Sequence, residues 1–276
     1  MQSFFDWLTH RATSINSLLC VGLDPRADTV QGLYADCVRI IEATHEYAAA
    51  FKPNSAFFEA FGPDGMHALQ EVIAHVPRGI PVILDAKRGD IGDTSEAYAK
   101  AAFDMYRAHA ITVSPYLGSD SVAPFIARTE CGAFVLCKTS NKGADELQML
   151  EVPIKQFSET YDYLYEIVAR NTLTWNTLNN VGLVVGATDP SALECVRAVA
   201  PEMWFLVPGI GAQGGDLEAS LKAGLRSDGL GLLINASRSI ARATDAGAEA
   251  RKLRDEINQF RVVHSAYSNE SITNNQ

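Results

Sequence analysis

Residues 82–95 read VILDAKRGDIGDTS and place charged side chains at the end of an apolar strand. The first three residues are apolar and partly β-branched, as in a strand buried on both faces. Asp85 and Lys87 are two residues apart, so on a regular strand they project to the same side. Asp90 follows just past the strand, where the chain turns. This placement is typical of an active site at the carboxyl end of a barrel strand.

Seven further apolar runs of strand length occur along the chain. They are LLCVGL from Leu18, AAAFKP from Ala48, AITVSPY from Ala110, AFVLCKTS from Ala133, VGLVVGA from Val181, MWFLVPG from Met203 and LGLLINAS from Leu230. Segments with helical periodicity separate them, and a repeat of roughly 30 residues fits one strand, one helix and two loops. We expect one α/β domain over residues 1–260, a (β/α)8 TIM barrel, with a doubly wound open sheet as the alternative. Residues 261–276 are polar and aperiodic, and we expect a poorly ordered tail.

Composition excludes several classes of partner. The chain has 276 residues and a net charge of −10, a field that repels nucleic acid and anionic membrane surfaces. An anionic ligand must therefore be held by a local pocket. The five cysteines form no CxxC pair and stand near no His at zinc-finger spacing, so we expect no metal site and reduced thiols in a cytoplasmic protein. No stretch approaches the ~18 apolar residues of a membrane span.

The charged strand end favours proton chemistry. Two carboxylates, Asp85 and Asp90, near one ammonium favour the charged form of Lys87 and oppose its neutralisation by burial. A protonated Lys can stabilise and then protonate a carbanion, whereas Schiff-base chemistry requires a neutral amine. A structural network of ion pairs is the alternative.

Two further charged residues lie at the carboxyl ends of other predicted strands. Lys52 stands near the carboxyl end of the second run, and neighbouring barrel strands lie about 5 Å apart, so it should approach Asp85 and Lys87. A Lys that extends to solvent is the alternative. Asp24 follows the first run in VGLDPR, where an Asx turn is the alternative.

A glycine-rich loop predicts a phosphate site. Residues 208–216 read PGIGAQGGD, follow the seventh run and precede a helix, whose positive dipole end would add to the loop amides. The eighth run continues into Ser237 and Arg238, which suit bidentate contact with phosphate. The GxGxxG pattern in this loop is weak support for dinucleotide binding, because that motif belongs after a first strand. Ordinary glycine-rich turns are the alternative.

Residues 138–160 form a long polar segment after the fifth run. Segments of this length are usually lids or binding loops, and this one begins on the catalytic side of the barrel. We therefore expect it to contribute to the site.

Taken together, these motifs resemble those of the orotidine 5'-phosphate decarboxylase family, in particular its second bacterial sequence type. The most specific is DAKRGDIGDTS, which matches the signature D-x-K-x-x-D followed by an apolar residue and a Thr. FKPNSAFFE, TSN at residues 139–141, VVGAT, VPGIGAQGGD and INASR resemble the other strand-end motifs in the expected order. The chain departs from the family at Lys142, where a Pro follows TSN in the family.

The resemblance implies decarboxylation of orotidine 5'-phosphate to UMP, without metal or cofactor, in a homodimer whose active sites are shared across the interface. It implies that Lys87 donates the proton to C6 of the pyrimidine beside Asp85, and that Asp90 and Thr94 reach the partner's site. The implied substrate-binding residues are Lys52 and Asp24 at the ribose, Ser140 at the pyrimidine edge, Gln213, Gly215, Ser237 and Arg238 at the phosphate, and Ile91 and Pro208 as apolar surface.

Two other functions remain open from the sequence. A hexulose-phosphate synthase or sugar-phosphate decarboxylase resembles this family in fold and signature but uses Mg²⁺. Ile91 after the second Asp, and the TSN loop, favour the metal-free enzyme. A non-catalytic nucleotide-binding protein could keep the phosphate loop alone, but it would not need Asp85, Lys87 and Asp90 together.

Overall fold

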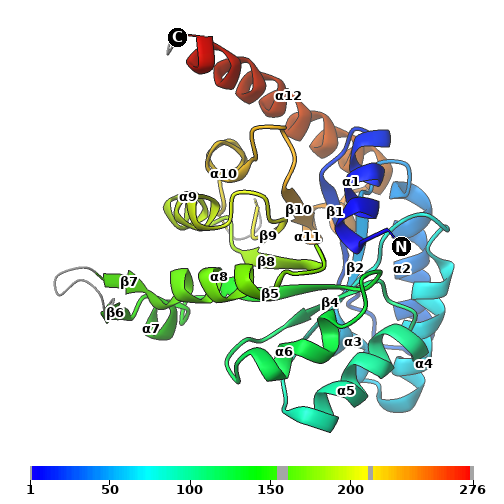
Figure 1. Cartoon of the computed structure of the whole chain (residues 1–276). Coiled ribbons are helices and arrows are strands. Elements are labelled where there is room, and N and C mark those ends of the chain that lie inside the picture. Colours follow the sequence, from blue (N-terminus) through cyan, green and yellow to red (C-terminus); the bar gives the residue numbers. More distant parts are fainter. Residues whose placement is uncertain (1, 154–160, 211–213, 274–276) are drawn as a thin grey trace.

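A computed structural model describes the backbone of residues 2–153, 161–210 and 214–273, and the side chains of these ranges as far as residue 261. The architecture is a barrel of parallel strands surrounded by helices (Figure 1).

Eight strands form the barrel, each at or near a run predicted from the sequence. They are β1 (Leu19–Leu23), β2 (Ala50–Pro53), β3 (Ile83–Arg88), β4 (Ala110–Val113), β5 (Gly132–Lys138), β8 (Val181–Val185), β9 (Phe205–Pro208) and β10 (Leu232–Ala236). Their order is β2-β1-β10-β9-β8-β5-β4-β3, and every pair in it is parallel. Parallel bridges from Phe51 to Val82 and from Asn54 to Asp85 join the two end strands. The barrel is therefore closed, and the (β/α)8 prediction is confirmed over the open sheet.

Helices connect the strands and cover the barrel. They are α2 (Val30–Thr44), α3 (Ser55–Glu59), α4 (Gly62–His75), α5 (Gly92–Lys100) with the π-helical turn η1 (Ala101–Met105), α6 (Ser119–Ile126), α8 (Leu164–Trp175), α9 (Pro190–Val199), α10 (Leu217–Gly224) and α11 (Arg238–Arg242). Side-chain caps start several of them: Thr29 accepts from the amide of Gly32, and Asp189 accepts from the amide of Ala192. These caps satisfy amides that lack partners within the helix.

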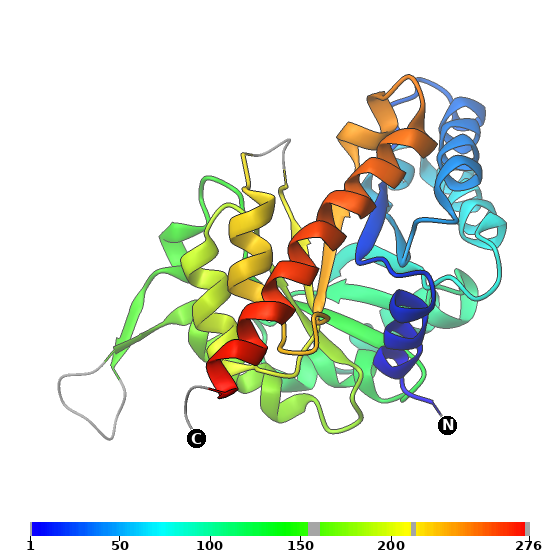
Figure 2. The same cartoon turned by 90° about the horizontal axis from the view of Figure 1, so that it is seen from above.

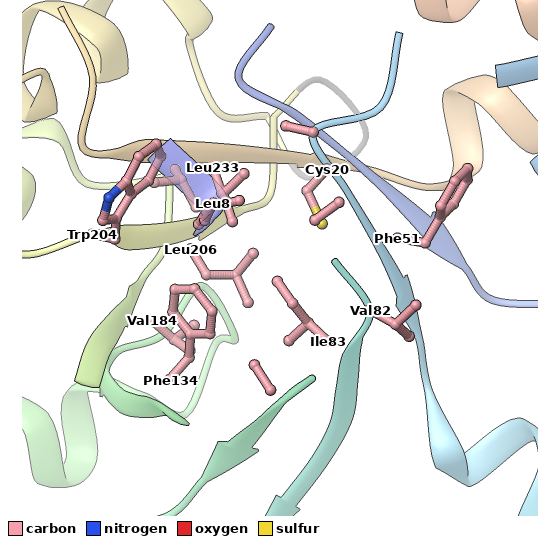
Figure 3. Close-up of a cluster of buried hydrophobic side chains, with 14 of the residues drawn as sticks. Leu8, Cys20, Phe51, Val82, Ile83, Phe134, Val184, Trp204, Leu206 and Leu233 are labelled. Atoms are coloured by element: carbon pink, nitrogen blue, oxygen red, sulfur yellow. The ribbon is translucent and has the colours of Figure 1, made fainter. Parts of the chain in front are cut away.

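Helix α1 (Phe4–Ser14) closes the amino-terminal end of the barrel. The ring of Phe5 packs edge-on against Phe134 of β5 and stacks on Trp204, which precedes β9. Figure 3 shows the apolar cluster, with Cys20, Ile83, Val184 and Leu206 in the space enclosed by the strands. A filled interior and a plugged lower end leave the carboxyl ends of the strands as the open face.

The long segment after β5 is more structured than a bare loop. It contains the short helix α7 (Asp145–Gln148) and the antiparallel strands β6 (Glu151–Pro153) and β7 (Tyr161–Tyr163). The hairpin extends away from the barrel (Figures 1 and 2). The Lys138 ammonium, which is buried, pairs with Asp145 at 2.7 Å and ties α7 to the end of β5.

The last helix, α12 (Ala246–Thr273), packs against α2 and α10 and crosses the outside of the barrel (Figure 2). Its backbone is helical through residues 261–273, which form most of the segment that the sequence analysis set apart as a polar tail. The chain has no Gly or Pro after Gly247, so this stretch lacks the two residues that interrupt a helix most strongly.

Candidate active site

A cavity of about 530 Å³ opens at the carboxyl ends of the strands. Residues from all eight barrel strands, or from the loops directly after them, line it. Among the described residues, its charged lining consists of three cations and two carboxylates, which are Lys52, Lys87, Arg238, Asp24 and Asp85. This local excess of positive charge suits an anionic ligand, although the whole chain is acidic.

The centre of the site is an alternating array of ammonium and carboxylate groups. The carboxylate of Asp85 accepts from the Lys52 ammonium at 2.7 Å and from the Lys87 ammonium at 2.5 Å, one on each oxygen. Lys52 and Asp85 are buried, whereas half of the Lys87 side chain (51%) is exposed to the cavity and solvent. Sequence analysis expected these three residues to meet, and the structure brings them together.

Burial and charge act in opposite directions on this array. Burial raises the pKa of Asp85, but the two ammonium groups and their hydrogen bonds outweigh it and hold that pKa well below its ordinary value. Burial lowers the pKa of Lys52, but the carboxylates of Asp85 and Asp24 outweigh it and keep that pKa above its ordinary value. At neutral pH, both groups are therefore charged.

Lys87 reaches the site through an irregular stretch of β3. Its backbone has φ +48°, in the left-handed region that costs a non-glycine residue about 1–2 kcal/mol. The pairing of β3 with β4 also shifts register between Leu84 and Arg88. The strand is thus distorted at Lys87, whose ammonium is the exposed member of the array.

The second carboxylate of the signature does not reach this cavity. Asp90 accepts a hydrogen bond from the Ile91 amide at 2.8 Å, and neither it nor Ile91 or Thr94 lines the cavity. Ile91 is 60% exposed and Thr94 is also exposed. All three lie where α5 begins, past the end of β3. In this chain, Asp85 is therefore the partner of Lys87.

Gly22 on β1 and Gly215 in the loop after β9 both allow close approaches of the chain beside the cavity. A Cβ on Gly22 would lie 1.9 Å from the Ser237 hydroxyl, so only glycine lets β1 approach the end of β10 here. Pro208, Ser237 and Arg238 all line the cavity, as expected. Gly215 does not line it. A Cβ there would lie 2.7 Å from the carbonyl oxygen of Gly209, so its role in the structure is to close the loop.

Two expectations for this loop have different outcomes. Gln213 lies outside the described residues. The sequence analysis expected the positive end of the α10 dipole to help bind phosphate. In the structure, Asp216 caps this helix, and its carboxylate accepts from the Ala219 amide at 3.1 Å. A carboxylate at the N-terminus already compensates the positive end of the helix. The loop amides and Arg238 thus remain the phosphate-binding candidates.

The sequence analysis assigned no site role to six neutral polar residues that line the cavity: Asn54, Thr112, Thr139, Asn141, Gln148 and Asn235. Gln148 binds both the amide and the hydroxyl of Thr139 at 2.8 Å, so α7 fixes the segment that carries Ser140. The Asn235 side-chain oxygen is buried without a hydrogen-bond partner in the described structure, as is one oxygen of Asp24. Unpaired acceptors facing a cavity are suited to ligand hydroxyl groups.

Other reactive groups are poor candidates. All five cysteines are free, and burial raises the pKa of Cys20 to about 12 and that of Cys131 to about 11, so neither is an activated thiolate. Within the described ranges, no three His, Cys, Asp or Glu side chains stand close enough to hold a metal ion. None of the helices searched there is long and apolar enough to cross a membrane.

Comparison with known proteins places this geometry in a family. The model of the orotidine 5'-phosphate decarboxylase / HUMPS family matches residues 17–253. A relative from Roseiflexus castenholzii, named orotidine 5'-phosphate decarboxylase, is 45% identical over 272 residues, or 93% of this chain and 97% of that protein. The structure of Leishmania donovani OMP decarboxylase has a TM-score of 0.88 and 59% identity, and covers 95% of this chain and 100% of that one. Leishmania donovani UMP synthase has a TM-score of 0.90 and 61% identity over 95% of this chain, which spans 57% of that longer protein.

Proposed function

The chain belongs to the orotidine 5'-phosphate decarboxylase / HUMPS family, and we propose that it converts orotidine 5'-phosphate to UMP and carbon dioxide. The family resemblance expected from the sequence is thereby confirmed. The observation that carries the proposal is the Lys52–Asp85–Lys87 array, which shares one cavity with Arg238 and the loop after β9.

The cavity suits the substrate when its phosphate lies at the loop after β9. Arg238, Ser237, the loop amides near Gly215 and Gln213 would bind the phosphate. Lys52 and Asp24 would hold the ribose hydroxyls, since Asp24 has a buried oxygen without a partner in the described structure. The pyrimidine would then lie between Ser140, Pro208 and Lys87. Contacts remote from the reacting carbon supply binding energy that can organise the site.

Lys87 performs the chemistry in this proposal. The bond between C6 and the carboxylate breaks, its electron pair stays on C6, and neutral carbon dioxide leaves. The Lys87 ammonium stabilises the developing carbanion, transfers a proton to C6, and regains a proton from solvent. A preorganised charge in a partly dry site is an effective way to lower such a barrier. Asp85 keeps the ammonium oriented at 2.5 Å.

Asp85 has a second effect in this proposal. Its carboxylate is charged and would lie near the substrate carboxylate, and the repulsion would be relieved as carbon dioxide leaves. Ground-state destabilisation of this kind is contested as a general explanation. We therefore assign the larger part of the catalysis to the Lys87 ammonium.

We further propose that the reaction needs no metal or cofactor. Metal-dependent relatives in fold stabilise an enediolate with Mg²⁺, which requires oxygen ligands arranged around the ion. Here, the one carboxylate of the Lys52–Asp85–Lys87 array is already paired on both oxygens by ammonium groups. Turnover that persists in excess EDTA would support this part of the proposal, and loss of turnover that Mg²⁺ restores would contradict it.

We propose that two subunits complete each site. Asp90, Ile91 and Thr94 lie outside the cavity of their own chain, and Ile91 is 60% exposed. The loop after β4, the strand that pairs with β3, also exposes two apolar side chains, Tyr116 (83%) and Leu117 (47%). Exposed apolar side chains that gather into one patch are typical of a protein interface. In a homodimer, Asp90 and Thr94 would then reach the site of the other subunit.

The test of the proposed function is an ultraviolet assay of orotidine 5'-phosphate loss with purified protein, with UMP identified as the product. Lys87→Ala should lose activity by about 10³-fold or more, since it removes both the positive charge and the proton donor. Lys252→Ala, on the exposed face of α12, serves as the control and should leave the rate unchanged. A wild-type protein that binds UMP but forms none would point to a nucleotide-binding protein instead.

A further inference from the structure

The pairing of β3 with β4 contains a bulge at the catalytic residues. Leu84 pairs with Ile111, and Arg88 pairs with Val113. Three residues of β3, Asp85 to Lys87, therefore face a single residue of β4, Thr112. The bulge leaves β3 amides without their usual strand partners, and a buried amide must find another acceptor.

The side chain of Thr112 occupies the place of the missing strand partner. Its hydroxyl oxygen accepts from the amide of Ala86 at 3.1 Å and from the amide of Lys87 at 2.9 Å. Its proton goes to Asp85 Oδ1 at 3.0 Å, the same oxygen that binds the Lys87 ammonium. A hydroxyl offers one donor and two acceptor positions, so all three are used. Thr112 is only 1% exposed.

We propose that Thr112 is a positioning residue for the proposed decarboxylation, on which this inference rests. One hydroxyl fixes the backbone on both sides of the Ala86–Lys87 peptide and the carboxylate that orients Lys87. It holds Lys87 at φ +48° and points its ammonium into the cavity. Thr112 lines the cavity but acts through Asp85 and Lys87 rather than on the reacting carbon.

The alternative is a threonine that merely stabilises a buried strand, and substitutions can separate the two roles. Thr112→Val keeps the branched shape and volume but removes the hydroxyl, while Thr112→Ser keeps the hydroxyl. Thr44→Val is the matched control, because Thr44 is equally buried and its hydroxyl donates to the Ile40 carbonyl within α2, away from the cavity.

The variants should differ in kcat but not in their affinity for UMP. Thr112→Val should lower kcat for orotidine 5'-phosphate by about 10- to 100-fold, as expected when a catalytic group is displaced by a fraction of an ångström to 1 Å. Thr112→Ser and Thr44→Val should stay within about 3-fold of wild type. Affinity for UMP should change by less than about 3-fold in all variants, because the proposed phosphate contacts are not touched.

Amide hydrogen exchange gives a readout that does not depend on activity. A peptide spanning residues 85–88 should exchange faster in Thr112→Val than in wild type, because two of its amides lose their acceptor. The same peptide should be unchanged in Thr112→Ser and in Thr44→Val. If Thr112→Val does not fold, Thr112→Ala replaces it in both measurements, since it also lacks the hydroxyl.

The inference fails if the variant without the hydroxyl keeps kcat and exchange within about 3-fold of wild type, or if Thr112→Ser is as slow as Thr112→Val. Wild-type turnover of orotidine 5'-phosphate tests the proposed function separately. If the wild type is inactive, the proposed function fails, and the exchange of residues 85–88 still decides whether Thr112 holds this segment.

Discussion

Replacing Asp85 with Asn should destabilise the protein by about 3–5 kcal/mol, because it leaves a buried ammonium without its counter-charge. Lys52 is 4% exposed, and its ammonium lies 2.7 Å from Asp85 Oδ2. An Asn side chain keeps the shape and an acceptor oxygen, so the change removes charge with little change in packing. Lys87 contributes little to this loss, because its half-exposed side chain can turn to solvent.

The magnitude follows from the distance and the burial. Two unit charges 2.7 Å apart attract by about 6 kcal/mol at an effective dielectric constant of about 20. Two contributions offset part of the loss. Asp24 still acts on Lys52, and the Asn oxygen can still accept a hydrogen bond from the ammonium. The remainder falls in the range measured when one partner of a buried pair is removed.

Urea unfolding at fixed protein concentration, followed by tryptophan fluorescence, would measure the loss. The companion variants are Lys52→Met and the double variant Lys52→Met/Asp85→Asn. The double variant should recover at least half of the loss, because it no longer buries an unpaired charge. Asp104→Asn is the control for the same chemical change, since Asp104 pairs with Arg128 at the surface and solvent screens that pair.

The direction in which stability changes with pH provides an independent test. In the wild type, the pKa of Asp85 is lowered by folding, so its stabilisation is present above the unfolded pKa of about 4 and is lost as pH falls through the folded value. The pKa of Lys52 is raised by folding, so its stabilisation is lost as pH rises above about 10.4. In Asp85→Asn, burial should instead lower the pKa of Lys52, and the unfolded chain then binds more protons. The stability of this variant should therefore rise from pH 7 toward pH 10.

Either of two results would refute this reasoning. The first is a variant Asp85→Asn within about 1 kcal/mol of wild type at pH 7, which would mean that the Lys52 ammonium is not buried in solution. The second is a variant whose stability falls from pH 7 to pH 10 as fast as that of the wild type or faster. A double variant no more stable than Asp85→Asn would show that the loss has another cause.

Three further predictions concern the substrate. Gly22→Ala places a Cβ 1.9 Å from the Ser237 hydroxyl and should raise KM by about 10-fold or more, while Gly22→Ala/Ser237→Ala should recover most of the loss; initial rates decide this. Arg238→Ala should weaken UMP binding by about 10- to 100-fold in calorimetry but leave uridine binding unchanged, and equal losses for both ligands would remove Arg238 from the phosphate site. Mixed dimers of Lys87→Ala with Asp90→Ala should regain about a quarter of wild-type activity after random exchange, because one site in each heterodimer is intact. No recovery in verified heterodimers would contradict shared sites.

The strands were predictable because each is an apolar run bounded by breaks, and a chain of eight such runs at a regular spacing has few ways to bury them. Charged strand-end residues were also predictable, since Lys52 and Asp85 are costly to bury unless they are used or paired. Neutral polar residues gave no such signal. Thr112 lies in the run AITVSPY, where a β-branched residue is ordinary, and Gln148 enters the site only because α7 folds back onto the end of β5.

The relation between Asp85 and Lys87 shows where sequence periodicity stops being sufficient. On a regular strand, residues two apart face one side, and that argument correctly predicted that both side chains reach one cavity. In the structure, they do so across a bulge, with Lys87 in the left-handed region and three residues opposite one. A regular strand would align both side chains with the barrel interior. The bulge instead lets the Lys87 ammonium lie beside the carboxylate at 2.5 Å, with half of its side chain still exposed. The conformation costs backbone energy, and the Thr112 hydroxyl offsets part of that cost because it accepts from the two displaced amides. The periodicity of β3 predicts neither the backbone strain at Lys87 nor the hydrogen bonds that offset it. The hydroxyl that accepts those bonds belongs to another strand, 25 residues from Lys87 in the sequence.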